Sequence, residues 1–565
     1  MFFQTLFVTL AYLPCTYSLV IKFIFNRPLK MSTLWAVIAS IFFLELTFVN
    51  NFVLPFEGLY KLDIIHFNDF HARFEETSIE TPTCHFNNGS CLGGFPRLYS
   101  AINNLKCQNP QALLLNAGDS FQGTYWYTLL KWKVTEEFMN LLPHDAHAIG
   151  NHDFDDGPEG LAPYIATLKA PVLAANMNSS KEPILQNLYE PYVILERGGR
   201  KIGIIGLITP DTKTLSFTGN IEFTDPHEAT RREAEKLTDL GVDIIILLSH
   251  CGYDVDIALA REHGQYVDVI VGGHSHRDES FVIPYLTIIE ADAELKKQVV
   301  VVQAYAFTKV LGNLSVYFDV NGNVVKWEGE PIPLNRSVRE DEEVKQKLAP
   351  YAKLVHEAEN TPVGAIKSTL DYRDCAHGEC KLGNLLGDAL NYRAKQANKK
   401  ADCISFLQRS NINAVIPKGS ITKGLIIELF PYYDFVETFK LKGKTILKAL
   451  ERSVSELTST APFEGPWLLQ VSGLRVRYNL SEPEGQRVVT VYVGDPGASN
   501  ELDKEGYYQV TAPAYLADGG DGYSMFKNEK TNVKIIGRDQ IVLENYIKEF
   551  SPLTVTTDER ILLTY

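Results

Sequence analysis

The chain has 565 residues, of which 45% are hydrophobic and 22% are charged, which is an ordinary globular composition. This length is enough for two or more domains with their own cores. The formal net charge of −15 argues against a nucleic-acid-binding surface, because neutralising many phosphates requires clustered Lys and Arg. A small anionic substrate stays compatible with this charge if metal ions supply the positive charge.

The chain begins with two apolar blocks, residues 1–25 and 34–54, separated by a basic patch. Neither block is a clean membrane span, because Pro14 interrupts the first and Glu45 the second. We interpret residues 1–56 as a leader that holds a removed secretory signal starting at Met31. The alternatives are an uncleaved N-terminal anchor and an upstream start that is not used.

Two further features fit export into an oxidising compartment. The chain has eight cysteines, and Cys84 with Cys91 and Cys375 with Cys380 form close pairs that suit disulfides across short loops. Neither pair has the C-x-x-C spacing of zinc fingers and thioredoxins. Five Asn-x-Ser/Thr triplets are candidate glycosylation sites: Asn88, Asn178, Asn313, Asn335 and Asn479.

Residues 62–303 alternate apolar strands with polar or glycine-rich turns, and several turns lead into amphipathic helix. This pattern predicts an α/β domain, and the continuous apolar runs suit strands that are covered on both faces. Residues 311–329 predict a hairpin with its turn at Asn321–Asn323, which closes the first domain. The expected strands of the α/β region are residues 62–68, 112–118, 145–151, 201–207, 242–250 and 267–274.

The charged stretch 339–359 predicts a connecting helix despite Pro350, and a second α/β region follows it. The C-terminal residues DERILLTY lack the polar spacer and apolar tail of a lipid-anchor signal, so we expect no stable membrane anchor after signal removal. The expected segments are a leader at 1–56, a first domain at 57–336, a helical linker at 337–360 and a second domain at 361–565.

Polar side chains with ligand chemistry follow the expected strands at their carboxyl ends. Any one of them alone has an ordinary explanation as a turn or surface residue. Their ordered recurrence predicts that residues about 200 positions apart converge on one crevice at a single sheet edge, where open α/β sheets form their binding sites. The residues are Asp69, His71, Asp119, Asn151, His152, His250, His274 and His276.

Without His152, this set holds two carboxylates, one amide and four imidazoles, which suffice for two adjacent metal ions with Asp119 as the natural bridging ligand. Such ligands favour zinc, manganese, iron or cobalt over the all-oxygen sites of magnesium or calcium. The ions would lower the pKa of a bound water and hold phosphate oxygens. His152 would present an imidazolium to the phosphate, and Asp155 would orient that ring, unless Asp155 only caps a turn or helix.

The segments HFNDFHARFEETS, GDSFQGT, GNHDFDDG, GGHSH and VVQAYAF together resemble the metallophosphoesterase-type 5′-nucleotidase/apyrase family over nearly the whole chain after the leader. The resemblance implies a two-sheet αββα metallophosphoesterase sandwich, joined by a helix to a C-terminal α/β domain that clamps the nucleotide. It also implies that the two close cysteine pairs are disulfides and that His152 and Asp155 form the catalytic pair. The implied metal ligands are Asp69, His71, Asp119, Asn151, His250 and His274, with His276 at a more variable position.

The second domain of this family holds the nucleobase between two aromatic rings and the ribose with an acidic residue. The matching segments LFPYYDF and APAYLADGGDGY nominate Tyr432 and Tyr515 for stacking and Asp521 for the ribose. Stacking between two rings contributes about 1–3 kcal/mol per base with little preference among bases. Without the resemblance, both tyrosines would be interpreted as core or turn aromatics.

The second domain departs from the family pattern where phosphate-facing arginines are expected. The family loop Asn-Gly-Gly-Gly-x-Arg is replaced by residues 405–415, with Asn411 at the place of the arginine, and Ala376 replaces an arginine between the paired cysteines. Arg409 and His377 are neighbouring cations that could substitute. They do not reproduce bidentate guanidinium recognition, so we expect weaker binding or an altered substrate choice.

The resulting hypothesis is a secreted, metal-dependent hydrolase that releases phosphate from extracellular purine nucleotides such as AMP, ADP or ATP. It resembles the soluble family members in the saliva of blood-feeding arthropods. The expected cofactors are two divalent ions, zinc first, with manganese, cobalt, magnesium or calcium as alternatives. One alternative function is a weakened family member that acts as a secreted binding or anti-haemostatic protein. Another is a phosphodiesterase or sugar-nucleotide hydrolase with the same metals.

Overall fold

The computed structural model describes residues 58–78, 84, 91–275, 285–292, 297–398, 403–412, 414–430, 433–455, 457, 467–494 and 500–564. The predicted leader, the variable ligand His276, the stacking residue Tyr432 and the glycosylation triplet at Asn88 lie outside these residues. Among the described residues, no helix is both long enough and apolar enough to cross a membrane.

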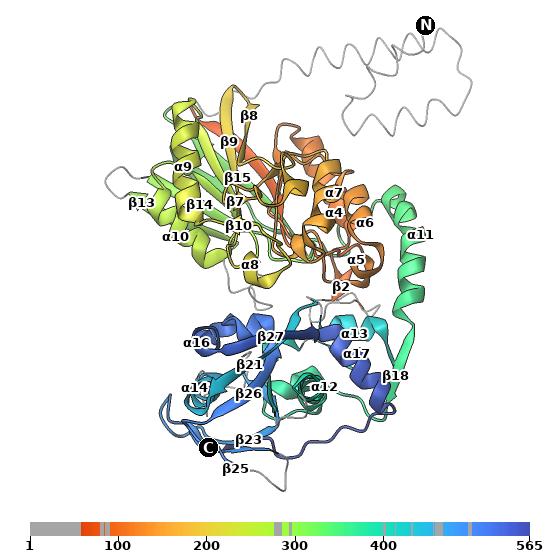
Figure 1. Cartoon of the computed structure of the whole chain (residues 1–565). Coiled ribbons are helices and arrows are strands. Elements are labelled where there is room, and N and C mark those ends of the chain that lie inside the picture. The colour runs from red at the N-terminus through yellow and green to blue at the C-terminus, as the bar shows by residue number, and fades with distance from the viewer. Residues whose placement is uncertain are drawn as a thin grey trace, which may run out of the picture.

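The N-terminal half is a sandwich of two β-sheets with helices on both outer faces (Figure 1). In the first sheet, β1, β4, β5 and β6 are parallel, and β15 and β16 join antiparallel at the edge. Its strands in spatial order are β16 (Val324–Glu328), β15 (Val310–Phe318), β1 (Tyr60–Phe67), β4 (Leu113–Asn116), β5 (Ala146–Ala148) and β6 (Val172–Leu173).

The second sheet has a parallel centre of β9, β11, β12 and β14, flanked by antiparallel β8 and β13. The chain therefore builds the first sheet, crosses over after β6 to build the second, and returns to the first with β15. The strands in spatial order are β13 (Leu286–Asp292), β14 (Lys297–Gln303), β12 (Val269–Gly272), β11 (Ile244–His250), β9 (Arg200–Ile208) and β8 (Tyr192–Arg197).

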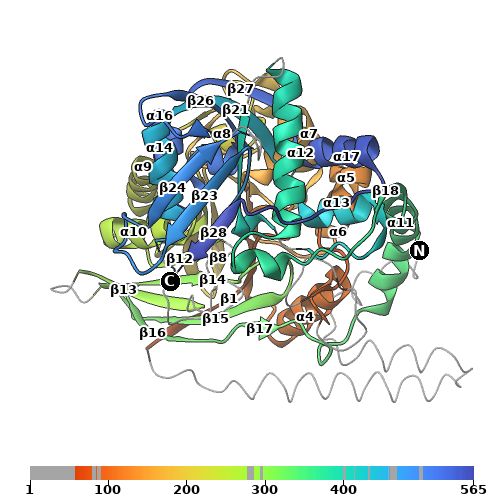
Figure 2. The ribbon, with the colours of Figure 1, turned by 90° about the horizontal axis from the view of Figure 1, so that it is seen from below.

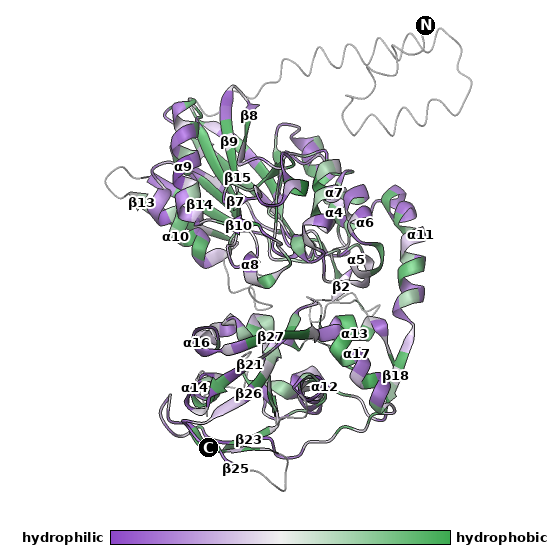
Figure 3. Cartoon of the chain, viewed as in Figure 1, coloured by the Kyte–Doolittle hydropathy of each residue, from purple (hydrophilic) through white to green (hydrophobic). Residues whose placement is uncertain are grey.

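The strands are apolar on both faces because each sheet has two neighbours. Ile64 of the first sheet and Ile204 and Ile246 of the second belong to one buried cluster between the sheets. A second cluster lies under the helices of the first sheet and a third under those of the second, so the hydrophobic colour concentrates on the strands (Figure 3). The covering helices are α4 (Phe95–Gln108), α6 (Trp132–Met139) and α7 (Gly157–Thr167) on the first sheet, and α9 (Pro226–Asp239) and α10 (Tyr253–His263) on the second.

Helix α11 (Glu342–Glu359) connects the two halves, as the charged stretch predicts. The Asp341 side chain caps it by accepting the Val344 N–H, and Pro350 lies inside the helix without ending it. The helix contacts α4 and α5 (Tyr125–Leu130) of the N-terminal half and α13 (Lys423–Leu429) of the C-terminal half. It therefore runs along one side of the molecule and touches both halves (Figures 1 and 2).

The C-terminal half is built on a five-stranded sheet with helices on both faces. Helices α12 (Lys381–Ala397) and α17 (Asp539–Phe550) cover one face, and α14 (Gly443–Ser453) and α16 (Ser524–Glu529) cover the other. A smaller sheet packs beside it (Figure 2). Its strands in spatial order are β25 (Asn500–Glu501), β24 (Val488–Val493), β23 (Leu474–Asn479) and β28 (Ile561–Thr564). The strands of the larger sheet are β22 (Leu469–Ser472), β19 (Cys403–Gln408), β26 (Tyr507–Pro513), β21 (Phe435–Lys442) and β27 (Thr531–Arg538).

The local predictions from sequence are confirmed. All six expected strands are present, and the hairpin of β15 and β16 turns where the Asp319 N–H donates to the Asn323 carbonyl oxygen. Both close cysteine pairs are disulfides, with Cα–Cα distances of 5.8 Å for Cys84–Cys91 and 4.8 Å for Cys375–Cys380.

Candidate metal centre

The predicted ligands meet at one end of the sandwich, but the prediction of a single sheet edge is wrong. Asp69, Asp119 and Asn151 follow β1, β4 and β5 of the first sheet. His250 ends β11 and His274 follows β12, and both strands belong to the second sheet. The chain crosses to the second sheet between these groups, so the carboxyl ends of strands from two packed sheets form the site together.

The ligand atoms form two adjacent groups that share Asp119. One group is Asp69, His71 and Asp119, and the other is Asp119, His250 and His274, with the ligand atoms of each group within 4.8 Å of one another. Nε2 of His71 lies 3.7 Å from a carboxylate oxygen of Asp69 and 3.7 Å from Oδ2 of Asp119. Nε2 of His250 lies 3.1 Å from the same Oδ2. A carboxylate in this position can bridge two cations.

The two central imidazoles are held with Nε2 toward the carboxylates. Nδ1 of His71 lies 3.1 Å from the carbonyl oxygens of both Phe121 and Gln122, and Nδ1 of His250 lies 2.7 Å from that of Ala117. A backbone carbonyl accepts only from a protonated Nδ1, so each ring keeps a lone pair on Nε2 when it is neutral. Metal-binding histidines are oriented by this kind of contact.

Several buried atoms of the centre lack ordinary hydrogen-bond partners among the described residues. Oδ1 of Asn151 has none, and Oδ2 of Asp119 and Nε2 of His250 contact each other at 3.1 Å and have no other hydrogen-bond partner. An unpaired buried polar atom costs about 1–3 kcal/mol, so these atoms at one place require an explanation. Cations explain them, because amide oxygen, carboxylate and imidazole are suitable ligands for divalent transition metals. The residues therefore fit a metal centre.

Glycines let the loops of the centre approach one another. A Cβ at Gly150 would lie 2.0 Å from Oδ1 of Asp119, and a Cβ at Gly273 would lie 2.9 Å from Nδ1 of His250. Asp119 itself has a left-handed backbone with φ of 55°. Such conformations cost of order 1–3 kcal/mol and persist at functional sites when the surroundings enforce them.

Asp153 holds the ligand loops together, and the sequence argument missed it. Its Oδ1 accepts the backbone N–H groups of Ser120 at 2.9 Å and Phe121 at 3.1 Å, and its Oδ2 accepts that of Gly150 at 2.9 Å. One buried carboxylate thus ties the loop after β4 to the loop after β5. The sequence shows three aspartates in NHDFDDG, and nothing in that pattern distinguishes Asp153 from its neighbours.

His152 and Asp155 form a pair beside the centre. Nδ1 of His152 lies 2.9 Å from Oδ2 of Asp155, and the Ser216 hydroxyl donates to the other oxygen of Asp155 at 2.9 Å. The His152 N–H donates to Oδ1 of Asp119 at 2.9 Å, which places the ring next to the ligands. Burial lowers the pKa of His152, but the Asp155 carboxylate outweighs burial and raises it to about 9. The Asp155 carboxylate therefore favours the protonated form of this imidazole.

Of the predicted substrate-binding residues that the structure describes, Tyr515 and Asp521 lie beside the turn that carries Arg409 and Asn411. The Tyr515 hydroxyl donates to Oδ1 of Asp521 at 3.1 Å, and the Ser410 hydroxyl donates to Oδ2. Ser410 lies between Arg409 and Asn411 in the 3₁₀ turn η5 (Arg409–Asn411). The Tyr515 side chain is 43% exposed, so its ring is available to a ligand.

Arg409 and His377, the two cations considered as substitutes, face other partners. The Arg409 guanidinium lies 4.8 Å from the centre of the Tyr372 ring, and its Nη1 donates to the Ile412 carbonyl oxygen at 2.9 Å. His377 is exposed at the end of the 3₁₀ turn η4 (Tyr372–Ala376). In this arrangement Arg409 stabilises its own loop.

Arg538, at the end of β27, is a cation that the sequence argument missed. Its guanidinium carbon lies 3.6 Å from the centre of the Phe435 ring and 4.3 Å from that of Phe217, which belongs to the N-terminal half. Its Nη1 donates to the Tyr433 carbonyl oxygen at 2.6 Å. Burial lowers the pKa of Arg538, and the Asp155 carboxylate opposes that shift, so the two charges lie within electrostatic reach across the two halves. Arg538 belongs to no sequence motif, so its position near Asp155 could not be predicted from the sequence.

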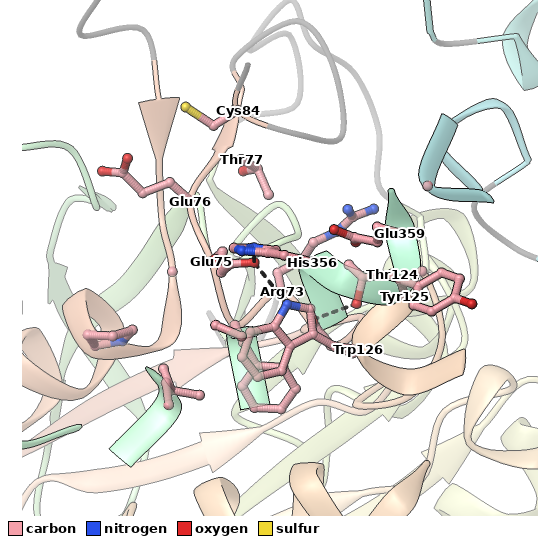
Figure 4. A pocket seen from close by; sticks show the side chains of 18 of the residues that line it. Arg73, Glu75, Glu76, Thr77, Cys84, Thr124, Tyr125, Trp126, His356 and Glu359 are labelled. Atoms are coloured by element: carbon pink, nitrogen blue, oxygen red, sulfur yellow. Dashed lines mark hydrogen bonds and ion pairs between the residues drawn. The ribbon is translucent and has the colours of Figure 1, made fainter. Parts of the chain in front are cut away.

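A groove of about 520 Å³ is lined by the N-terminal half, α11 and α13 (Figure 4). Its lining includes Ala72, the residue that follows the ligand His71. Inside it, Glu75 accepts from Nε1 of Trp126 at 3.0 Å and pairs with Nε2 of His356 at 2.9 Å. Its carboxylates outnumber its cations, so it does not suit a phosphate. The carboxylates are those of Glu75, Glu76, Glu340, Glu359 and Glu428.

Comparisons with known proteins agree with this geometry. Residues 62–278 match the family model described as calcineurin-like phosphoesterase, and residues 357–528 match the one described as 5′-nucleotidase, C-terminal domain. The chain is 36% identical to an apyrase from Tabanus yao over 89% of this chain and 93% of the relative. It is 40% identical to an apyrase from Anopheles gambiae over 88% of this chain and 89% of the relative. The solved structure of a 5′-nucleotidase precursor from Thermus thermophilus superposes with a TM-score of 0.71 at 34% identity, covering 89% of this chain and 99% of that one.

Proposed function

The chain belongs to the family of 5′-nucleotidases with a calcineurin-like phosphoesterase domain, and on that premise we propose that it releases phosphate from extracellular nucleotides with two divalent metal ions. The observation that carries the proposal is the position of Asp119, which is shared by two groups of ligand atoms. A pair of ions with a common carboxylate suits phosphate hydrolysis, because it can stabilise both the attacking and the leaving oxygen.

We assign Asp69, His71 and Asp119 to one ion and Asp119, His250 and His274 to the other. Oδ1 of Asn151 joins the ligands because it is buried and has no hydrogen-bond partner among the described residues. When bound, the ions supply a Lewis acid and a water of lowered pKa. Imidazole and carboxylate ligands favour zinc, with manganese and cobalt as the next candidates.

The roles of His152 and Asp155 follow from charge and geometry. The His152 cation stands beside the ligands, so its Nε2–H can donate to a phosphate oxygen and stabilise the negative charge that develops on the leaving oxygen. Asp155 accepts from Nδ1 of His152, fixes the ring and keeps it protonated. Asp155 is a positioning residue in this scheme.

We place the nucleoside at the C-terminal half, against the Tyr515 ring and the Asp521 carboxylate. Asp434 links this place to the metal centre and supports the placement. Its carboxylate accepts the Tyr515 N–H at 2.9 Å. Burial raises the pKa of Asp434 to about 6, and the positive charges of Arg538 and His152 oppose that rise. The base site therefore lies within electrostatic reach of His152. Secretion is part of the proposal and rests on the leader and on the resemblance to secreted family members.

The second candidate function is a weakened family member that binds nucleotides without rapid turnover. The observation in its favour is the loop at 405–412, where Asn411 replaces a phosphate-facing arginine and Arg409 bonds to its own loop. The ordered ligand set of the N-terminal half argues against this candidate, because a binding protein does not need two groups of metal ligands that meet at one carboxylate.

The test is phosphate release from ATP, ADP and AMP by the purified chain, with and without a chelator. We expect release that the chelator abolishes and that Asp119→Ala lowers by at least about 10²-fold. Asp239→Ala, at an exposed aspartate of α9, is the matched control and should retain full activity. Release that is insensitive to the chelator would refute the metal mechanism. Binding without release from any nucleotide would favour the second candidate.

A further inference from the structure

A second set of metal-binding side chains lies on the outer face of the second sheet. His227 is at the N-terminal end of α9, and Glu262 and His263 are the last residues of α10. Their ligand atoms lie within 4.8 Å of one another. Helix α10 begins just after His250 and runs for 11 residues, so its far end is about 15 Å from the metal centre. This cluster is therefore separate from the centre described above.

His263 is the most informative member of the cluster. The residue is only 3% exposed, and neither Nδ1 nor Nε2 has a hydrogen-bond partner among the described residues. A buried imidazole normally bonds through at least one nitrogen, because an unpaired donor or acceptor is costly in the interior. Its Nε2 lies 4.0 Å from a carboxylate oxygen of Glu262, so the unpaired ring is next to the other two ligands.

His227 completes the cluster from the neighbouring helix. Its Nδ1 lies 2.7 Å from Oε2 of Glu262, and the two histidine rings have their centroids 5.4 Å apart. The Asp225 side chain caps α9 by accepting the His227 N–H at 2.8 Å, which fixes the backbone that carries the ring. The His227 and His263 rings therefore face one shared carboxylate from two different helices.

Charges of both signs act on this place: the Arg231 guanidinium and the N-terminal end of α9 oppose a cation, and three negative groups attract one. The last turn of α10 presents carbonyl oxygens, which carry the negative end of the helix dipole. The Glu262 carboxylate adds a full negative charge, and the Asp225 carboxylate lies beside His227. Two imidazoles and one carboxylate form a common donor set for zinc, with a fourth position open to water.

We propose that His227, Glu262 and His263 form a third metal site that binds one zinc-class divalent cation and clamps α9 to α10. A cation here would bind one of the two unpaired nitrogens of His263 and join two helices that pack on the same sheet. Binding would stabilise the folded chain, because the unfolded chain does not hold the three ligands together. The site is independent of the proposed hydrolysis, since none of its residues belongs to the centre at Asp119.

The experiment counts zinc ions per chain by elemental analysis, after equilibration of the full chain with zinc and removal of the free metal. We expect three ions for the wild type and two for the double variant His227→Ala/Glu262→Gln. His356→Ala is the matched control, because it removes another half-exposed histidine that is paired with a glutamate, and it should retain three ions. Nucleotide phosphate release should be the same within twofold in all three chains.

Thermal unfolding gives a second readout. Zinc added to the chelator-treated wild type should raise the unfolding temperature by a few degrees more than it does in the double variant. The single variant Glu262→Gln replaces a side chain that is 62% exposed, so it keeps the fold and still removes one ligand. Equal zinc counts and equal temperature shifts in the wild type, the double variant and Glu262→Gln would overturn the proposal. Loss of an ion together with unchanged activity separates this result from a failure of the hydrolase proposal.

Discussion

At the scale of single residues, the closest approach in the metal centre is between Gly150 and Asp119. A Cβ at Gly150 would lie 2.0 Å from Oδ1 of Asp119 and 2.3 Å from its backbone nitrogen. Hydrogen bonds fix the position of Asp119: its Oδ1 accepts the His152 N–H, and Asp153 holds the loop that follows it. A methyl group at this position must therefore displace the shared carboxylate.

We expect Gly150→Ala to weaken metal binding and nucleotide hydrolysis by about 10–100-fold, as loss of ligand positioning does in other metal sites. Metal titration and phosphate release measure both effects. The control is Gly241→Ala, where a Cβ would meet nothing within 4 Å and only the positive φ of 70° is strained. Wild-type metal affinity in Gly150→Ala would show that Asp119 is not held as the structure indicates.

Asp268, at the start of β12, makes a separate contribution to the pH dependence of stability. It is 3% exposed, its Oδ2 accepts the Ile245 N–H at 2.9 Å, and burial raises its pKa from 3.8 to about 7. The folded chain then binds this proton more tightly than the unfolded chain. The carboxyl therefore stabilises the fold most at low pH, and that contribution falls as the pH rises from about 4 to about 7.

Asp268→Asn should remove this dependence, because the amide oxygen can still accept the Ile245 N–H and carries no charge. The variant should match the wild type near pH 4 and become more stable by up to a few kcal/mol near pH 8, at about 1.4 kcal/mol per unit of pKa shift. Urea unfolding at the two pH values measures the difference. A difference between the chains that does not change with pH would contradict the assignment.

Much of the site could be predicted from sequence at this scale, since its residues follow apolar strands in motifs with fixed spacing. His250 is the last residue of β11 and Asp119 comes three residues after β4, so the sequence alone associates both side chains with strand ends. Asp153 and Arg538 were not predictable, because their roles depend on which backbone groups or rings lie opposite them in space. The His227 and His263 cluster is formed by the packing of two helices, which the pattern of either helix alone does not show.

At the scale of elements, the apolar pattern located the strands, and their division into two sheets was predicted only by the family resemblance, which the structure confirms. Strands covered on both faces have the same continuous apolar pattern whichever sheet they join. The crossover after β6 depends on packing between residues far apart in sequence, such as Ile64 and Ile246 in the core between the sheets. This is why the single-edge expectation failed while each strand was located.

The loop after β5 acts as one unit with the loop after β4, and Asp153 is the link. Asp153→Ala leaves three buried N–H groups without their acceptor, at about 1–3 kcal/mol for each unpaired group before relaxation. We expect a clear fall in unfolding temperature and weaker metal binding. Asp153→Asn should have a smaller effect on both, because the amide oxygen can still accept the N–H groups of Ser120 and Phe121.

Asp156→Ala is the control for this loop. Asp156 belongs to the same NHDFDDG segment but bonds to the Lys131 ammonium and the Tyr127 hydroxyl, away from the ligands. Metal titration should give the lowest affinity for Asp153→Ala, a higher affinity for Asp153→Asn, and an affinity close to that of the wild type for Asp156→Ala. Equal metal affinity in all three would show that the two loops are held by other contacts.

At the scale of the whole molecule, the candidate metal ligands and the proposed nucleoside-binding residues belong to different halves of the chain. The Phe217 ring of the N-terminal half contacts the Phe435 ring of the C-terminal half with centroids 4.4 Å apart, and Arg538 covers both. Lys527 pairs with Asp211 at 3.7 Å nearby. In the proposed function, the N-terminal half hydrolyses a substrate that the C-terminal half binds. The activity then depends on this junction between the halves.

Arg538 of the C-terminal half carries a positive charge that opposes the rise in the pKa of Asp155, the proposed partner of His152. It can replace part of the charge that the family places at Ala376 and Asn411. A charge-assisted hydrogen bond contributes about 1.5–3 kcal/mol, so Arg538→Ala should lower kcat/KM for ATP by about 10–100-fold. The loss should be smaller for AMP, which has fewer phosphate oxygens to bind, and Arg538→Lys should recover part of it because it restores the charge without the planar fork.

The alternative is that Arg538 only joins the halves through its rings, and Lys527→Ala distinguishes the two roles. That variant removes another contact between the halves, at a side chain that is 52% exposed, and leaves the charge near Asp155 in place. Steady-state kinetics with ATP, ADP and AMP should then show wild-type values for Lys527→Ala and a graded loss for Arg538→Ala. If Arg538→Ala lowers kcat/KM equally for all three substrates and Arg538→Lys recovers none of the loss, Arg538 acts by joining the two halves. The phosphate contact must then come from another residue.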